Sequence, residues 1–271
     1  MPEAAITQQM LGDDLRGAGI RLGSVVIVHS SLKAIGPVIG GARSVVGALM
    51  DAVGPQGTLL LPTFSYPQPD GIFRVASTPS RTGAMTESFR QSAGAIRSLH
   101  PTHSVSAWGA RTEEFTAGHE LTSGLGVGSP FHRAAAAGAM MLMIGCDLRA
   151  CSVVHVAEAI TRVPYLGRVW FEGRFCDLTL ITPDGVQIHF PPRDLPACST
   201  GFTVVQSLLE ERRLLKRIQI GHARSLLFSA ADALTAAIEM LESNPAALLC
   251  HDAACPVCPK AKAIITETVR T

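Results

Sequence analysis

Two short apolar runs separated by a glycine-bounded helical segment constrain the fold of this chain more than any other feature. Residues 24–28 are β-branched after their first residue and have the length of a buried strand, and residues 58–63 form a second such run. Between them, residues 42–53 show helical spacing and end at Gly54-Pro55. A strand, a helix and a strand in this order predict a βαβ unit.

The rest of the chain extends this pattern. Strands are expected at residues 104–108, 139–144 and 223–228, and helices at 4–18, 86–91, 110–115, 131–137, 201–215 and 229–241. Two alternating runs, 176–181 and 186–190, flank Pro183-Asp184-Gly185 and predict a β-hairpin. Residues 64–82 are rich in Pro, Ser, Thr and Gly and are expected to form an extended loop.

The composition indicates a folded protein with an apolar core, since 47% of the 271 residues are hydrophobic and 17% are charged. We expect one α/β domain over residues 1–271, in which the hairpin, helices and cysteine-rich tail of residues 168–271 pack on residues 1–167. The net charge of +1 and the scattered Lys and Arg residues argue against nucleic acid and membrane partners. Without a recognisable signal peptide or an apolar run of about 20 residues, a soluble cytoplasmic protein is expected.

A polar stripe follows the apolar run that ends before Gly145. Ser152, His155 and Glu158 recur every three residues, which places a hydroxyl, an imidazole and a carboxylate on one face of a helix. Enzymes of the α/β class present catalytic side chains in this way at the carboxyl ends of strands. The alternative is a core histidine with Glu158 at the helix surface, and these residues alone leave both interpretations open.

Two loops carry further candidates. Residues 29–33 (HSSLK) could hold a phosphate or a pantetheine arm, or form an ordinary polar turn, although neither a Walker nor a dinucleotide glycine pattern is present. Residues 100–104 (HPTHS) could form a metal pair, a hydrogen-bonded corner or a cofactor contact. No G-x-S-x-G motif supports a serine hydrolase, whereas Cys146 or Cys151 near His155 would supply the residue types for thiol catalysis.

The cysteines form a separate pattern. Seven of them, an odd number without an export signal, indicate reduced thiols or a metal rather than disulfides. Cys250, Cys255 and Cys258 have the spacing of a zinc knuckle, and Cys198 lies upstream. Four thiolates would complete a closed structural zinc site, with His251 as the other candidate for the fourth ligand. Unliganded thiols in the tail are the alternative.

Four motifs in a fixed order resemble those of one protein family. They are residues 28–36 (VHSSLKAIG) with Gly40-Gly41, 97–109 (RSLHPTHSVSAWG), 126–130 (GVGSP) and 152–158 (SVVHVAE). Together they resemble the aminoglycoside 3-N-acetyltransferases, also called the antibiotic N-acetyltransferase family. The similarity covers most of residues 20–170 and continues to about residue 240.

The resemblance implies a fold and an activity. The fold would be a three-layer α/β sandwich, unrelated to the GNAT acetyltransferases, with a central mostly parallel or mixed sheet and a hairpin-containing C-terminal part. The activity would be acetyl transfer from acetyl-CoA to the 3-amino group of a 2-deoxystreptamine aminoglycoside, a reaction of antibiotic resistance. Residues 1–167 would form the CoA-binding and catalytic part of a monomer or a homodimer.

The resemblance also implies residue roles. His155 and Glu158 match the family's catalytic pair, and Ser152 matches the hydroxyl before it. Contacts to the CoA arm carry over to Ser30, Ser31, Leu32, Lys33, His103, Ser104 and Val105. A histidine base suits deprotonation of an amine, Ser152 or Ser104 could stabilise the oxyanion, and Asp147 and Glu158 could attract a polycation.

The acceptor is the least determined part of this prediction. Asp147 and Arg149 fall where family members vary, and the loop at 64–82 is short of carboxylates. One alternative is an acyl-CoA N-acyltransferase acting on a non-antibiotic amine in biosynthesis. The others are a thiol- or zinc-dependent hydrolase and a CoA-binding protein without catalysis.

Overall fold

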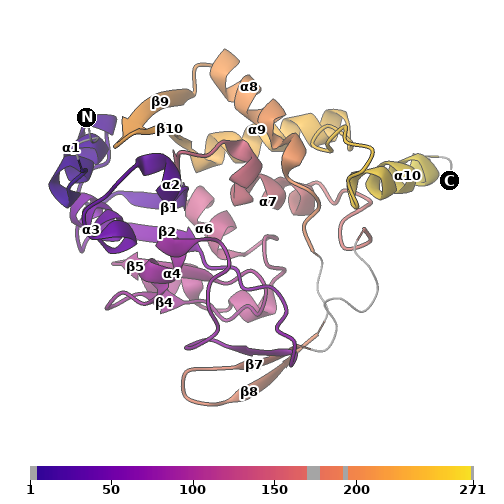
Figure 1. The fold of residues 1–271 in the computed structure, drawn as a ribbon. Coiled ribbons are helices and arrows are strands. Elements are labelled where there is room, and N and C mark those ends of the chain that lie inside the picture. The colour runs from indigo at the N-terminus through magenta and orange to yellow at the C-terminus, as the bar shows by residue number, and fades with distance from the viewer. Residues whose placement is uncertain (1–4, 170–177, 192–194, 270–271) are drawn as a thin grey trace.

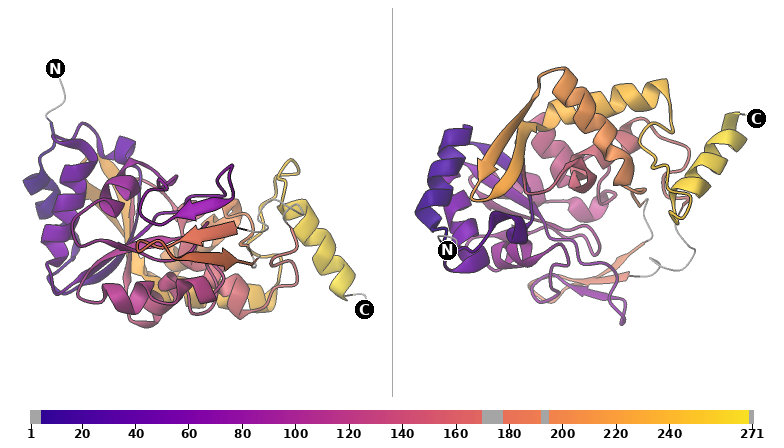
Figure 2. Two further views of the ribbon diagram at one scale, coloured as in Figure 1. Left: turned by 90° about the horizontal axis from the view of Figure 1, so that it is seen from below. Right: turned by 45° about the horizontal axis from the view of Figure 1, so that its top comes forward.

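A computed structural model describes residues 5–169, 178–191 and 195–269 of the chain. A seven-stranded sheet lies at its centre, and helices cover both faces (Figures 1 and 2). In spatial order the strands are β4 (Ile96–Arg97), β5 (Val105–Gly109), β2 (Thr58–Pro62), β1 (Val25–Ser30), β6 (Met140–Ile144), β10 (Ala223–Ser229) and β9 (Leu215–Ile220). The predicted α/β class is confirmed.

The strand directions make the sheet mixed. β1 pairs in parallel with β2 and β6, whereas the other four pairings within this sheet are antiparallel. The predicted βαβ unit is present as β1, α3 and β2. Because β1 and β6 are parallel neighbours in register, their last residues, Ser30 and Ile144, pair at the same edge of the sheet.

Alternate residues of the central strands face two separate cores. Val26 and Val28 of β1 belong to one, and Ile27 belongs to the other. The first core is covered by α1 (Gln8–Ala18), α2 (Leu32–Ile35), α3 (Gly41–Val53) and α4 (Ala84–Arg90). The second is covered by α5 (Thr112–Thr116), α6 (Pro130–Ala136), α7 (Ser152–Ile160), α8 (Thr203–Glu211), α9 (Ala230–Ser243) and the start of α10 (Cys258–Val269). Short 3₁₀ turns are η1 (His119–Leu121), η2 (Leu148–Ala150) and η3 (Thr200–Phe202).

The segment expected to be an extended loop contains a strand. β3 (Ile72–Arg74) pairs in parallel with β7 (Leu178–Ile181). β7 in turn pairs with β8 (Gln187–Phe190), which gives the expected hairpin. The first two residues of the predicted hairpin, 176 and 177, lie outside the described part of the chain. Phe73 packs on Leu180, and the Arg97 guanidinium lies 4.7 Å from the centre of the Phe73 ring. The expectation of an extended loop over residues 64–82 therefore fails only at β3, because a strand of three residues is too short to show a period in the sequence.

The helix expected at residues 201–215 is shorter than predicted. α8 ends at Glu211, and Arg213 takes a left-handed conformation with φ of +58°. The chain then reverses and enters β9, a strand that the sequence did not predict. β9 is an edge strand whose side chains are mostly partly exposed, so it lacks the apolar run that marks a central strand.

The end of β6 places the polar stripe of Ser152, His155 and Glu158 near the edge of the sheet. Gly145 follows it with φ of +64°, where a Cβ would lie 2.3 Å from that of Ala34, so only glycine allows this close turn. η2 comes next, and α7 begins at Ser152. Val153, Val154, Val156 and Ala157 of α7 are fully buried. The first turn of α7 is thereby anchored beside the carboxyl ends of β1 and β6.

No helix of the described residues is long and apolar enough to cross a bilayer.

Candidate active site

A cleft of about 910 Å³ opens at the carboxyl edge of the sheet. Segments that are far apart in the sequence meet in it. Its lining includes His29 and Ser30 of β1, Ser152 and His155 of α7, His103 of the corner before β5, and parts of the segments 62–86, 196–200 and 250–257.

A buried hydrogen bond holds the histidine of the polar stripe. Nδ1 of His155 lies 2.7 Å from Oε2 of Glu158, and the Glu158 side chain is fully buried. A carboxylate accepts hydrogen bonds, so Nδ1 carries the proton and Nε2 is left with its lone pair. The imidazole lines the cleft and packs edge-on against Phe202, with 4.6 Å between ring centroids. This arrangement orients a basic nitrogen at the wall of the cleft.

Tyr165 completes the carboxylate's hydrogen bonds. Its hydroxyl donates to Oε1 of Glu158 at 3.0 Å, and the side chain is fully buried. Burial and the neighbouring Glu158 charge raise the pKa of Tyr165 well above its usual value, so the group stays a phenol and a donor. Residue spacing could not indicate this contact, because Arg162 with φ of +52° turns the chain back after α7.

The end of β1 presents polar atoms without partners. Nε2 of His29 and Oγ of Ser30 are buried, and neither has a hydrogen-bond partner within the described part of the chain. Burial lowers the pKa of His29 to about 4, which keeps its ring neutral near pH 7. Buried polar atoms normally have partners. Both residues line the cleft, so a bound molecule could satisfy them.

The segment around residue 103 is a hydrogen-bonded corner, one of the three interpretations of its sequence. Nδ1 of His100 accepts the backbone N–H of His103 at 3.0 Å, and Thr102 Oγ1 lies 2.8 Å from Nδ1 of His103. Burial, together with a smaller effect of His155, lowers the pKa of His103 to about 3. His103 is therefore a neutral hydrogen-bonding group on the cleft wall.

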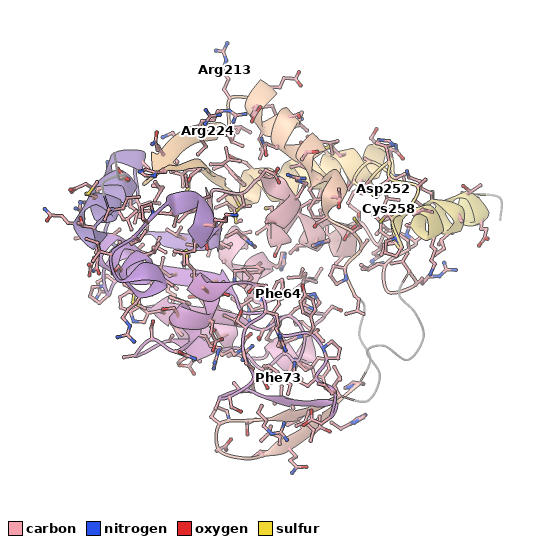
Figure 3. The ribbon with its side chains drawn as sticks, in the orientation of Figure 1. Phe64, Phe73, Arg213, Arg224, Asp252 and Cys258 are labelled. Atoms are coloured by element: carbon pink, nitrogen blue, oxygen red, sulfur yellow. The ribbon has the colours of Figure 1, made fainter. Side chains whose placement is uncertain are left out.

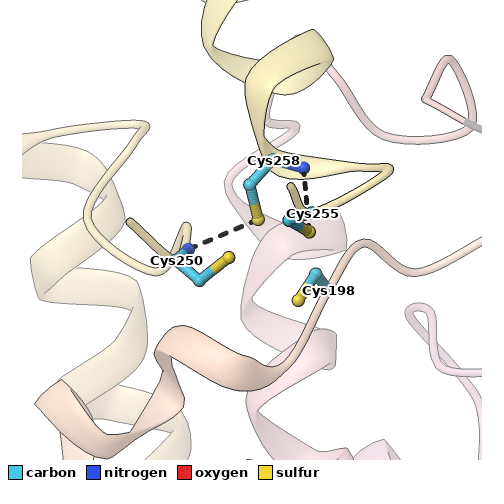
Figure 4. Close-up of side chains that lie close together, drawn as sticks. All are labelled: Cys198, Cys250, Cys255 and Cys258. Carbon is cyan, nitrogen blue, oxygen red and sulfur yellow. Dashed lines mark hydrogen bonds between the residues drawn. The ribbon is translucent and has the colours of Figure 1, made fainter. Parts of the chain in front are cut away.

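Four cysteines gather together (Figure 4), and three of them, Cys198, Cys250 and Cys255, line the cleft. The sulfurs of Cys198, Cys250, Cys255 and Cys258 all lie within 4.8 Å of one another. The N–H of Cys250 donates to the sulfur of Cys258 at 3.3 Å, and the N–H of Cys258 donates to that of Cys255 at 3.4 Å. Burial works to raise the pKa of Cys255, but the N–H groups of Cys258 and Val257 outweigh it, and the pKa falls to about 7.

Comparison with known proteins identifies the family. A family model described as aminoglycoside 3-N-acetyltransferase matches residues 27–242. The chain belongs to this family. The aminoglycoside N(3)-acetyltransferase III of Serratia marcescens is 31% identical over 269 residues, which cover 88% of this chain and 98% of that protein.

Solved structures of acetyltransferases share the fold. The aminoglycoside acetyltransferase AAC(3)-IVa, crystallised with a gentamicin, superposes with a TM-score of 0.84 at 27% identity and covers 98% of this chain and 100% of its own. AAC-IIIb, in a binary complex with CoASH, gives a TM-score of 0.74 at 26% identity over 89% of this chain and 97% of its own. The family resemblance of the sequence motifs is confirmed.

The other residues expected to contact CoA lie at different depths. The Ser104 hydroxyl donates to the Thr63 carbonyl at 2.8 Å and accepts from Nε of Arg97 at 2.9 Å, and Val105 is in the core. Ser31 precedes α2, Leu32 is partly buried against the first core, and Lys33 is exposed. Ser30 and His103 are the two members of this set that line the cleft.

The two acids expected to bind the acceptor have other partners. Asp147 forms an ion pair with Arg149 at 2.8 Å, and this hydrogen-bonded contact lowers the pKa of Asp147. Asp147 borders a second cavity of about 720 Å³, which also contains Arg217 and Arg224. Glu158 is buried behind His155. Neither carboxylate lines the cleft.

The two thiols that precede His155 in the sequence, Cys146 and Cys151, are unsuited to nucleophilic catalysis. Burial raises the pKa of both Cys146 and Cys151 to about 12, so both stay protonated near neutral pH. A thiolate is the nucleophilic form of cysteine. Burial therefore disfavours Cys146 and Cys151 as nucleophiles.

Proposed function

We propose that this protein transfers the acetyl group of acetyl-CoA to the 3-amino group of 2-deoxystreptamine aminoglycosides, with His155 as the general base. The observation that carries the proposal is the hydrogen-bonded series Tyr165, Glu158, His155, which ends at the cleft. Membership of the family supports the reaction, and the CoASH and gentamicin complexes of the two related structures support the two substrates.

The base removes a proton from the acceptor. An aminoglycoside amine is protonated near neutral pH and cannot attack a thioester until that proton is lost. Nε2 of His155 accepts it, and the Glu158 carboxylate stabilises the imidazolium. The amine attacks the thioester carbon, the C–S bond of the tetrahedral intermediate breaks, and the CoA thiolate takes the proton from His155. The acylated nitrogen releases its second proton to solvent. The products are an N-acetyl amide and CoA.

The oxyanion of the intermediate requires hydrogen-bond donors. Ser152 is the first residue of α7 and lines the cleft, and its hydroxyl has no partner within the described residues. The first N–H groups of a helix also lack intrahelical partners. Such donors contribute about 3 kcal/mol to stabilisation of the transition state. Ser30 and His29 remain to contact the CoA arm.

Replacing the base should abolish turnover but not cosubstrate binding. We expect His155→Ala to lower kcat for kanamycin acetylation by about 10³-fold, since a positioned general base contributes that order of rate. The measurement is release of free CoA, with the Kd for CoA determined in parallel. His189→Ala, an exposed histidine of β8, is the control. Wild-type turnover in His155→Ala would show that His155 is not the base.

Tyr165→Phe tests whether the phenol positions the dyad. The variant leaves Oε1 of Glu158 buried without its donor, so we expect kcat to fall about tenfold, with little change in either KM. Ser207→Ala, which removes an exposed hydroxyl of α8 outside the cleft, is the control. Equal kcat values for Tyr165→Phe and wild-type protein would contradict a positioning role.

We also propose that Cys198, Cys250, Cys255 and Cys258 bind a structural zinc ion. Tetrahedral zinc–thiolate bonds of about 2.3 Å require sulfurs about 3.8 Å apart, which is compatible with sulfurs lying within 4.8 Å of one another. The N–H of Cys258 favours the thiolate form of Cys255 and lowers its pKa. Four protein ligands leave no open position, so the ion would have a structural role.

The zinc proposal predicts one zinc ion per chain by elemental analysis. A chelator should lower the Tm because the metal links the Cys198 segment to the C-terminal tail. Cys258→Ser should lose zinc, whereas Cys146→Ser, which changes a thiol outside the cluster, should retain it. Stoichiometric zinc in Cys258→Ser, or none in wild-type protein expressed with added zinc, would refute the site.

A further inference from the structure

We infer that the loop between Cys250 and Cys255 forms the acceptor-binding wall of the cleft, and that Asp252 on this loop binds ammonium groups of the acceptor. The inference rests on the proposed function, because it takes the acceptor to be a polycationic amine. It assigns a residue that determines specificity and takes no part in the proton transfer.

The cysteine cluster and the proposed base share one cleft. Cys198, Cys250, Asp252 and Cys255 line the same cavity as His155. In Figure 3, Asp252 and Cys258 are labelled at the start of α10, and Phe64, another residue of the cleft lining, lies nearer the middle of the molecule. A molecule bound in this cavity can therefore contact both the 250–255 loop and the His155 imidazole.

Asp252 is the one carboxylate among the described residues that line the cleft. Its side chain is exposed, and Oδ1 accepts the N–H of Ala254 at 2.9 Å. No Lys or Arg within the described residues pairs with it, so Oδ2 is left for a ligand. A polycation entering the cleft would find its anionic partner here.

The cleft lining also carries positive charge. Arg81 lines the cleft beside Thr82, and its guanidinium has no acidic partner in the described part of the chain. Arg149 also lines the cleft, but Asp147 neutralises it at 2.8 Å. The Arg81 guanidinium suits the phosphates of CoA, and the Asp252 carboxylate suits the amine.

The cysteines at the two ends of the 250–255 loop determine the position of Asp252. Both ends of its short loop are cysteines of the cluster, and within the loop the N–H of Cys255 donates to the Asp252 carbonyl at 3.2 Å. Binding of a metal by these cysteines would hold the loop in one conformation. The carboxylate would then be positioned before the acceptor arrives, which favours affinity.

The test is Asp252→Asn, with kanamycin and acetyl-CoA as substrates. We expect the KM for kanamycin to rise about tenfold, kcat to stay within about twofold and the KM for acetyl-CoA to be unchanged. Calorimetry should show the same loss of kanamycin affinity without turnover. Asp252→Glu keeps the charge and should restore most of the affinity. Glu267→Gln removes an exposed carboxylate of α10 outside the cleft and should change neither KM.

The outcomes separate the two proposals. If wild-type protein acetylates kanamycin and Asp252→Asn binds it with wild-type affinity, the role of Asp252 is refuted while the proposed function stands. If wild-type protein neither binds nor acetylates kanamycin, the proposed function fails and the inference falls with it. Zinc content measured on each variant distinguishes the effect of losing the Asp252 carboxylate from the effect of losing the metal. If the affinity for kanamycin falls only in zinc-depleted samples, a direct contact between Asp252 and the acceptor is also refuted.

Discussion

The fully buried carboxylate of Glu158 is the group on which the site depends. A charge placed there without partners would cost several kcal/mol, and the protein supplies two hydrogen-bond donors, Nδ1 of His155 and the Tyr165 hydroxyl. Satisfying the carboxylate therefore also fixes the plane and the tautomer of the imidazole. Nε2 is presented to the cleft as an acceptor, which is the state in which a histidine can take a proton from an amine.

The sheet places this dyad where other polar groups gather. β1 and β6 end together, so His29, Ser30 and the first turn of α7 share one edge, and the apolar residues of α7 hold that turn against the second core. The cysteine cluster lies at the same cleft on the C-terminal part of the chain. Two walls built from distant segments thus enclose a space large enough for a thioester and an acceptor.

Local sequence patterns predicted most of the central elements. β1, β2 and β6 are short apolar runs, and Ser152, His155 and Glu158 lie on one helix, so their proximity follows from helical geometry. Tyr165 and Asp252 could not be found in this way, because Tyr165 reaches Glu158 only after a left-handed turn, and Asp252 meets the cleft only through tertiary packing. β9 escaped prediction because an edge strand need not be apolar.

The central claim is that His155 removes the proton from the acceptor amine. A crystal structure of the protein with CoA and kanamycin tests it most directly through the distances from Nε2 of His155 to the acceptor 3-amino nitrogen and to the CoA sulfur. The account predicts that the 3-amino nitrogen lies about 3 Å from Nε2, within hydrogen-bond reach, with the sulfur on the same side of the imidazole. A complex in which the amine lies beyond reach of Nε2, with another basic side chain beside it, would contradict the account.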